Sequence, residues 1–177
     1  DSDLTFWRER VVISLRSDWT VGGRTWPRGA LLVGDAAEFL RGGRDFQVLF
    51  TPTARNSLAG WTATRSTLVL NILEDVASRL EEWKPVEGRW TQRAVKAPFP
   101  GTLGVSALHD SWQKDDPLAE QLLLTYTDFL TPDSLLLGRT GSDERELLKT
   151  RPTFYDAAGM RVEQRFATSR DGTRVPY

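Results

Sequence analysis

Three strand-like runs recur along this chain, and their repetition limits the folds that it can adopt. The runs are Val11–Arg16, Leu68–Leu73 and Leu122–Thr127, and their starts lie 57 and 54 residues apart. Further short runs rich in Leu, Val, Trp and Thr follow each of them, separated by Gly, Pro, Asp or Asn, which is typical of strands joined by turns. We therefore expect an all-β protein built from tandem copies of one small sheet.

Each copy supplies additional predicted strands. The second and third strands of the copies are predicted at Ala30–Gly34, Ser78–Trp83, Ser134–Gly138, Phe46–Phe50, Arg89–Val95 and Arg145–Lys149, and upstream strands at Ser57–Thr64 and Thr102–Leu108. Four strands in roughly 40 to 55 residues is the period of a β-propeller blade. One such sheet cannot bury both faces alone, so it stacks on its neighbours, which explains strands that are apolar at successive positions.

The expected fold is thus a partial β-propeller, an open arc of about three four-stranded antiparallel blades over residues 1–152. The blades are assigned to about 1–55, 56–101 and 102–152. The first should be incomplete because only Asp1–Thr5 precede the continuous strand-like stretch Phe6–Leu15 that contains its first run. Rings generally need about four to eight blades, so three should leave apolar faces exposed. We therefore expect self-association or strand exchange of the isolated chain. An ordinary β-sandwich is the competing architecture.

Local signals outside the main repeats predict two short helices and one further hairpin. The helices are expected at Asp35–Leu40 and Asp115–Gln121. Near the end of the chain, Asp171-Gly172 is a strong turn signal between two strand-like runs, Phe166–Ser169 and Thr173–Tyr177. The segment from Pro152 to Met160 is interpreted as a connector, so residues 153–177 are expected to lead into another domain.

Composition excludes several functional classes. The net charge is −1, which removes any argument from bulk charge for nucleic-acid binding. The chain has no Cys, so disulfides, Cys-ligated zinc and thiol catalysis are excluded, while the redox compartment stays undetermined. No apolar run is long enough to span a membrane.

The acidic residues and the single histidine are the candidates for catalytic or metal-binding groups in this chain. His109 could act as a base beside Asp110 and Ser106 or Ser111, but adjacency in sequence is not triad geometry, so we expect a loop histidine. Two adjacent acid pairs, Glu81-Glu82 and Asp115-Asp116, lack metal-ligand spacing. Neighbours in a strand point to opposite faces, so the first pair cannot act together on one substrate. The sequence therefore predicts no catalytic residue, metal ligand or cofactor site in this chain.

The glycine pairs and the tryptophans are interpreted as structural. Gly22-Gly23 and Gly42-Gly43 lack the context of phosphate-binding loops and are expected to form hairpin turns. The excursion from Asp18 to Trp26 is unusually long and is expected on one rim of the propeller. The seven tryptophans are expected to pack within and between blades rather than to stack on sugars, and they are Trp7, Trp19, Trp26, Trp61, Trp83, Trp90 and Trp112.

Several motifs together resemble the prolyl oligopeptidase family of serine peptidases. The matching stretches are Leu15–Trp19 with Gly29–Leu32, Leu70–Val76 with Ser78–Leu80, and Val162–Tyr177. The last contains Ser-x-Asp-Gly-Thr-x-x-Pro from Ser169 to Pro176, which in this family marks re-entry into the catalytic domain. The resemblance covers essentially the whole chain.

The resemblance implies a propeller that caps an α/β-hydrolase domain and filters short peptide substrates, which are typically cleaved after proline. The family's nucleophile motif, Gly-x-Ser-x-Gly, does not occur here. Its closest counterpart is the run from Gly104 to Leu108, which lacks the second glycine. We therefore expect an inactive, substrate-gating part of a serine endopeptidase, whose partners are short peptides and its own hydrolase domain.

Two alternatives stay open at this stage. One is a free-standing β-propeller that binds proteins or peptides, and the other is a peptidase that cleaves after basic residues, like oligopeptidase B. The specificity pocket would lie mostly outside this chain, so the residues present do not choose between specificities. The expected compartment is the cytoplasm, with the periplasm as the open alternative, and neither nucleic acid nor a membrane is expected as a partner.

Overall fold

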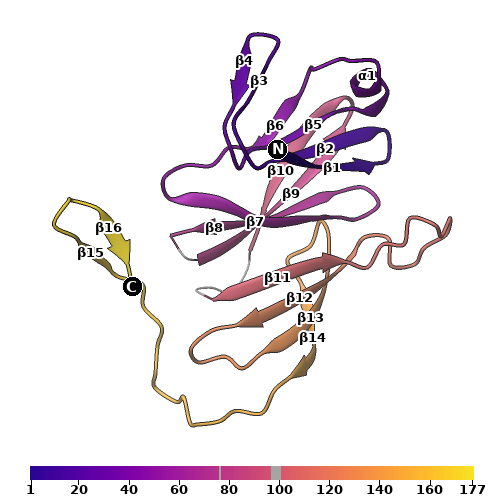
Figure 1. Cartoon of the computed structure of the whole chain (residues 1–177). Coiled ribbons are helices and arrows are strands. Elements are labelled where there is room, and N and C mark those ends of the chain that lie inside the picture. Colours follow the sequence, from indigo (N-terminus) through magenta and orange to yellow (C-terminus); the bar gives the residue numbers. More distant parts are fainter. Residues whose placement is uncertain (76, 97–100) are drawn as a thin grey trace. The chain divides into compact units, whose positions relative to one another are not determined.

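Short antiparallel strands make up most of the computed structural model, which describes residues 1–75, 77–96 and 101–177. Val76, in one of the family-like motifs, and residues 97–100, near the end of the expected second blade, lie outside the described residues. Three four-stranded sheets and two small hairpins are present in the described ranges, and no sheet closes on itself (Figure 1). The chain divides into two units, Asp1–Leu58 and Ala59–Tyr177, which are described separately. The predicted all-β, open, propeller-like architecture is confirmed.

The first sheet is complete, which corrects the expectation that its upstream strand is missing. Its strands are β1 (Ser2–Trp7), β2 (Arg10–Leu15), β5 (Leu31–Asp35) and β6 (Gln47–Phe50), in that order across the sheet. A tight turn at Arg8, whose φ is 55°, folds β1 back so that Trp7 pairs with Arg10. The sequence was interpreted as one continuous run there because the turn contains neither Gly nor Asn.

A hairpin and a short helix cover one face of this first sheet. The hairpin joins β3 (Trp19–Val21) to β4 (Arg24–Trp26) through Gly22 and Gly23, both with positive φ, as a hairpin turn of this type requires. Trp26 packs among buried residues of β2 and β5, with the ring of Phe46 at 5.7 Å between centroids. The long excursion expected between two strands is therefore a small apolar flap on its own sheet.

The helix α1 (Ala36–Leu40) confirms one of the two predicted helices and corrects one turn. Asp35 caps it, since its carboxylate accepts a hydrogen bond of 2.8 Å from the backbone N–H of Glu38. Gly42 and Gly43 do not form a hairpin turn. Their N–H groups donate to the carbonyls of Phe39 and Glu38 and end the helix, which is a common use of glycine after a helix.

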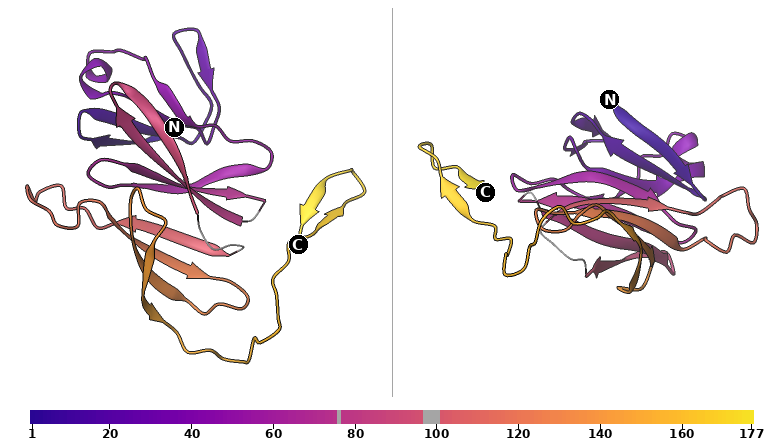
Figure 2. Two further views of the ribbon diagram at one scale, coloured as in Figure 1. Left: turned by 180° about the vertical axis from the view of Figure 1, so that it is seen from behind. Right: turned by 90° about the horizontal axis from the view of Figure 1, so that it is seen from below.

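The second and third sheets pack face to face within residues 59–177 (Figure 2). The second contains β7 (Asn56–Ala63), β8 (Leu68–Glu74), β9 (Ala77–Val86) and β10 (Arg89–Val95), and the third contains β11 (Thr102–Ala107), β12 (Gln121–Thr127), β13 (Ser134–Arg139) and β14 (Arg145–Thr150). The shared core is built from Val69, Leu80, Leu103, Leu122, Leu124 and Tyr126. Burial of this apolar surface is the main force that holds the two sheets together.

The predicted C-terminal hairpin is present, and the second predicted helix is not. The hairpin pairs β15 (Phe166–Thr168) with β16 (Arg174–Pro176), and Gly172 in the turn has φ 85°. The chain reaches it from β14 as an extended connector without regular structure (Figure 1). Residues 115–120 form turns instead of the helix predicted at Asp115–Gln121. Asp and Pro, which suggested the start of a helix there, are equally typical of turns.

Candidate functional site

His109 is bound to an aspartate and not to either serine once considered beside it. Its Nδ1 lies 2.8 Å from Oδ2 of Asp116, and the two side chains are 14% and 2% exposed. A carboxylate only accepts, so Nδ1 carries the proton. The same Oδ2 accepts from the backbone N–H of Asp110 at 3.0 Å, and Oδ1 accepts from that of Leu118 at 2.8 Å. The contact with His109 is the main reason that the pKa of Asp116 is lowered.

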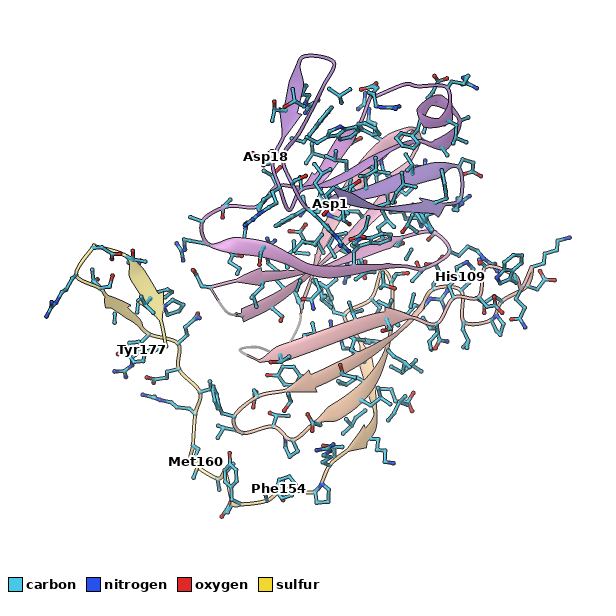
Figure 3. The ribbon with its side chains drawn as sticks, in the orientation of Figure 1. Asp1, Asp18, His109, Phe154, Met160 and Tyr177 are labelled. Carbon is cyan, nitrogen blue, oxygen red and sulfur yellow. The ribbon has the colours of Figure 1, made fainter. Side chains whose placement is uncertain are left out.

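The contacts of this cluster lie within a single loop. The loop, residues 108–120, joins β11 to β12, and Figure 3 places His109 within it. Nη2 of Arg65 donates to the carbonyls of Gln113 and Lys114, at 3.3 and 3.0 Å. Oδ1 of Asp110 accepts from the backbone N–H of Trp112 at 3.0 Å. His109 therefore binds a carboxylate that itself accepts from two backbone N–H groups of the same loop.

The acid pair Glu81-Glu82 is divided between the two faces of β9, as alternation in a strand requires. Glu81 accepts from Nε1 of Trp83 at 3.1 Å. On the other face, Glu82 pairs with Arg93 at 3.1 Å and accepts from the backbone N–H of Gly141 at 2.9 Å. The two carboxylates therefore cannot share one substrate, and each has a structural partner.

Glu82 belongs to a polar network that links the second and third sheets and that no motif in the sequence indicates. Arg93 also contacts Asp143 in the turn between β13 and β14. Asp143 accepts from the backbone N–H of Lys96 at 3.0 Å, and this hydrogen bond, followed by the effect of Arg93, lowers the pKa of Asp143. Nη2 of Arg145 donates to the carbonyl of Lys96 at 2.6 Å. The network fixes one end of the contact between the sheets.

Two hollows lie at the other end of the third sheet, where the connector leaves β14. One, of about 410 Å³, is lined by Thr127, Asp128, Phe129, Val162, Gln164 and Tyr177. Phe129 is 84% exposed. Burial opposes ionisation of Asp128, but hydrogen bonds from Tyr126 Oη and from the N–H groups of Leu130 and Thr131 lower its pKa. This hollow is a candidate surface for packing or passage of peptide, and it contains no nucleophile–base pair.

A second hollow, of about 640 Å³, opens on the same end of the sheet, beside Thr125, Leu135, Lys149 and Arg151.

In the described ranges no three His, Asp or Glu side chains are grouped to hold a metal ion. Over those same ranges, no helix has the length and apolarity needed to cross a bilayer.

The tryptophans differ in exposure. Trp7 and Trp26 are buried, four others are half-buried, and Trp112 alone among the seven is exposed.

The comparison with known sequences and structures identifies the relatives of this chain. No protein-family model matches it. It is 30% identical over 175 residues to an uncharacterized peptidase of Sinorhizobium fredii, an alignment that covers 97% of this chain and 23% of that protein. It is 24% identical over 184 residues to an uncharacterized peptidase of Rickettsia prowazekii, with 99% of this chain and 24% of that protein covered.

Solved structures give the same result at the level of the fold. A post-proline cleaving enzyme from Rickettsia typhi superposes with a TM-score of 0.75 at 23% identity, over 99% of this chain and 25% of that one. Oligopeptidase B from Leishmania major superposes with a TM-score of 0.66 at 19% identity, over 99% and 24%. The chain has the fold of the prolyl oligopeptidase family of peptidases. The resemblance carried by its sequence motifs is confirmed. The chain spans about a quarter of the length of the two peptidases that it matches in sequence.

Proposed function

We propose that this chain is the substrate-gating propeller part of a serine endopeptidase of the prolyl oligopeptidase type, which hydrolyses short proline-containing peptides. The observation that carries the proposal is the alignment of nearly the whole chain with about a quarter of two peptidases. The stacked four-stranded sheets and the hairpin from Ser169 to Pro176 agree with that assignment. In this role the chain contributes shape and access, and the reacting groups come from another part of the protein.

The environment of His109 supports the non-catalytic part of the proposal. Hydrolysis by a serine peptidase needs a nucleophile, a base and an orienting acid in mutual contact. Here the only histidine is held by Asp116, and the carboxylate is occupied by backbone N–H groups. We therefore expect the isolated chain to cleave no peptide.

The test uses the complete gene product that contains this sequence. Fluorogenic peptides with Pro, Arg or Ala before the reporter group are compared, with the isolated chain as a negative control. Preference for Pro supports the proposal, and preference for Arg assigns an oligopeptidase B-like specificity instead. Absence of hydrolysis of every peptide, together with peptide binding, would favour a free-standing binding propeller and overturn the proposal.

Gating makes a separate claim about substrate length. A propeller that filters substrates should make the turnover of long peptides much slower than that of short ones with the same cleavage site. If two cysteines are introduced to form a disulfide between neighbouring sheets, its oxidation should also slow the hydrolysis of short peptides. Reduction of the disulfide should restore the rate. Equal kcat/KM for short and long peptides would reject gating while leaving the peptidase assignment intact.

We also propose that the isolated chain self-associates through the outer face of the third sheet. Leu123 and Leu137 are paired across β12 and β13 on the face opposite the shared core, and Leu135 lies on that same face. All three are only partly buried. A concentration-dependent rise in mass by light scattering, abolished by Leu137→Lys, supports the proposal, and a monomer at every concentration rejects it.

A further inference from the structure

The connector between β14 and β15, residues 151–165, is the longest segment without helix or strand in the described ranges. Figure 1 shows it extended between the third sheet and the C-terminal hairpin. Ala157 and Val162 are partly buried, and every other residue of the connector is exposed. Segments of this kind are the preferred places for cleavage of a folded chain by a protease, if their backbone is also unpaired.

The stretch from Arg161 to Gln164 meets that second condition. Within the part of the chain that the structure describes, none of its backbone N–H or C=O groups takes part in a hydrogen bond. The side-chain amide of Gln164 donates to the carbonyl of Asp75, which holds the end of the stretch and leaves its backbone free. A protease binds its substrate in an extended conformation through backbone hydrogen bonds, so these groups are available to it without the opening of any sheet.

Arg161 supplies the side chain that a protease of trypsin-like specificity recognises. Its side chain is 81% exposed and pairs with Glu163, with 2.5 Å between Nε and Oε1. A pair this exposed holds the arginine weakly, because water competes for both groups. Proteases of this class bind a guanidinium to a carboxylate at the base of their specificity pocket. Arg161 can therefore leave its partner and enter such a pocket.

The other two arginines of the connector are less suited to cleavage. Arg151 is followed by Pro152, which lacks the N–H that a substrate presents beyond the cleaved bond. Arg165 is paired at both backbone groups, because its N–H donates to the carbonyl of Tyr177 at 2.9 Å and its carbonyl accepts from the N–H of Tyr177 at 2.8 Å. Arg161 is thus the basic residue of the connector whose following bond is accessible.

Two exposed basic residues in other loops are also constrained. The carbonyl of Lys114 accepts a hydrogen bond of 3.0 Å from Nη2 of Arg65, so the bond that would be cut is held in place. Arg170 lies in a tight turn that is closed by the N–H of Gly172, which donates to the carbonyl of Ser169 at 3.0 Å. A tight turn does not fit the extended cleft of a protease.

We propose that the connector is a processing site at which a protease of trypsin-like specificity hydrolyses the bond between Arg161 and Val162. One water molecule is consumed, and the products are a carboxylate on Arg161 and a free amine on Val162. The cut separates the three sheets from the hairpin of β15 and β16. The inference rests on the proposed function in one respect, since a cut connector should loosen a gating part and relax its selection against long peptides.

The test is limited digestion of the complete gene product with trypsin, followed by mass spectrometry of the fragments. We expect the first cut within this sequence after Arg161, and Arg161→Gln should slow it at least about tenfold. Val162→Pro keeps the arginine and should block the same cut. Arg170→Gln is the matched control in the neighbouring turn and should leave the digestion unchanged. A first cut elsewhere in this sequence would overturn the inference, and so would a bond that is cut only after denaturation.

A second measurement distinguishes an accessible bond from one that is exposed by unfolding. Leu124→Ala weakens the shared core of the second and third sheets, so it should speed cuts within those sheets. The rate of the cut after Arg161 should stay within about twofold, because that bond is accessible in the native state. A rise of this rate in parallel with the cuts inside the sheets would show that cleavage requires unfolding, and the inference would then be wrong.

The outcome is separable from that of the proposed function. Cleavage after Arg161 in a gene product without peptidase activity would keep the processing site and reject the proposed function, whereas an active peptidase with a resistant connector would do the reverse. Where both hold, the cut protein should hydrolyse long peptides at least about threefold faster relative to short ones than the uncut protein does. An unchanged ratio would reject the effect on gating.

Discussion

Glu82 on β9 accepts a hydrogen bond of 2.9 Å from the backbone N–H of Gly141, in the turn between β13 and β14. The carboxylate is 6% exposed and also pairs with Arg93 on the neighbouring strand. One buried acid therefore joins two strands of its own sheet to the next sheet. Polar contacts of this kind are directional, so they fix the angle and register between stacked sheets. Apolar packing alone specifies that angle and register less well.

Replacement of this acid should weaken the contact between the two sheets. Glu82→Gln removes the charge that balances Arg93 and is expected to lower the free energy of unfolding by about 1–3 kcal/mol. The measurement is chemical denaturation followed by tryptophan fluorescence, with Glu146→Gln on the exposed strand β14 as the control. In a double-mutant cycle with Arg93→Gln we expect coupling of at least about 0.5 kcal/mol. Strict additivity would show that the pair contributes nothing.

Truncation of the shared core should have a larger effect. Leu124 is 3% exposed and packs between the second and third sheets. Leu124→Ala removes apolar contacts and leaves a cavity, so we expect a loss of about 2–5 kcal/mol in the free energy of unfolding. The control is Leu147→Ala on the edge strand, where the side chain is 56% exposed and the loss should stay below about 1 kcal/mol. Similar losses at both positions would contradict the assigned core.

The turn of the first sheet's hairpin offers a test of backbone conformation. Gly22 has φ +61°, where an L side chain is strained, although an added Cβ would meet no atom within 4 Å. Gly22→Ala should therefore destabilise the first sheet by about 1–2 kcal/mol through the backbone alone. Gly60 also has open space but no positive φ, so Gly60→Ala is the matched control and should not be destabilising. Thermal unfolding of both variants separates strain from steric conflict.

The strand pattern could be predicted from the sequence because each strand is specified locally. Runs such as Leu68–Leu73 are apolar at successive positions and end at turn residues, so their existence did not depend on tertiary context. β1 was not predicted because its turn at Arg8 contains no typical turn residue, so that Phe6–Leu15 was assigned to one continuous strand-like run. The helix predicted at Asp115–Gln121 does not form, because Asp116 binds His109 and two backbone N–H groups. These contacts exist only in the folded loop, so the sequence alone did not reveal them.

The features of the candidate site depend on contacts between distant residues, and so the sequence did not reveal them. Arg93 and Asp143 are 50 positions apart, and nothing in their spacing predicts that they meet. Trp112 could not be told from the other tryptophans, since exposure depends on which of them falls on a covered sheet face. The expectation that this chain carries no catalytic residue rests on missing motifs alone, whereas the role of His109 needed the position of Asp116.

Acid should loosen the C-terminal hairpin at Asp171. Its carboxylate accepts from the hydroxyl of Ser169 and from the backbone N–H of Thr173 at 3.0 Å, and these hydrogen bonds lower the pKa of Asp171 to about 2. Because the pKa in the folded chain lies below the ordinary aspartate value of 3.8, the carboxylate stabilises the hairpin fully at pH values above 3.8. The stabilisation is lost as the pH falls through about 2. NMR titration of the Asp171 carboxyl carbon should give this low value, and the Thr173 amide should lose protection over the same pH range. Asp171→Asn should abolish the pH dependence of that amide, and a carboxyl that titrates near 3.8 in the unaltered chain would show that the turn hydrogen bonds are not formed in solution.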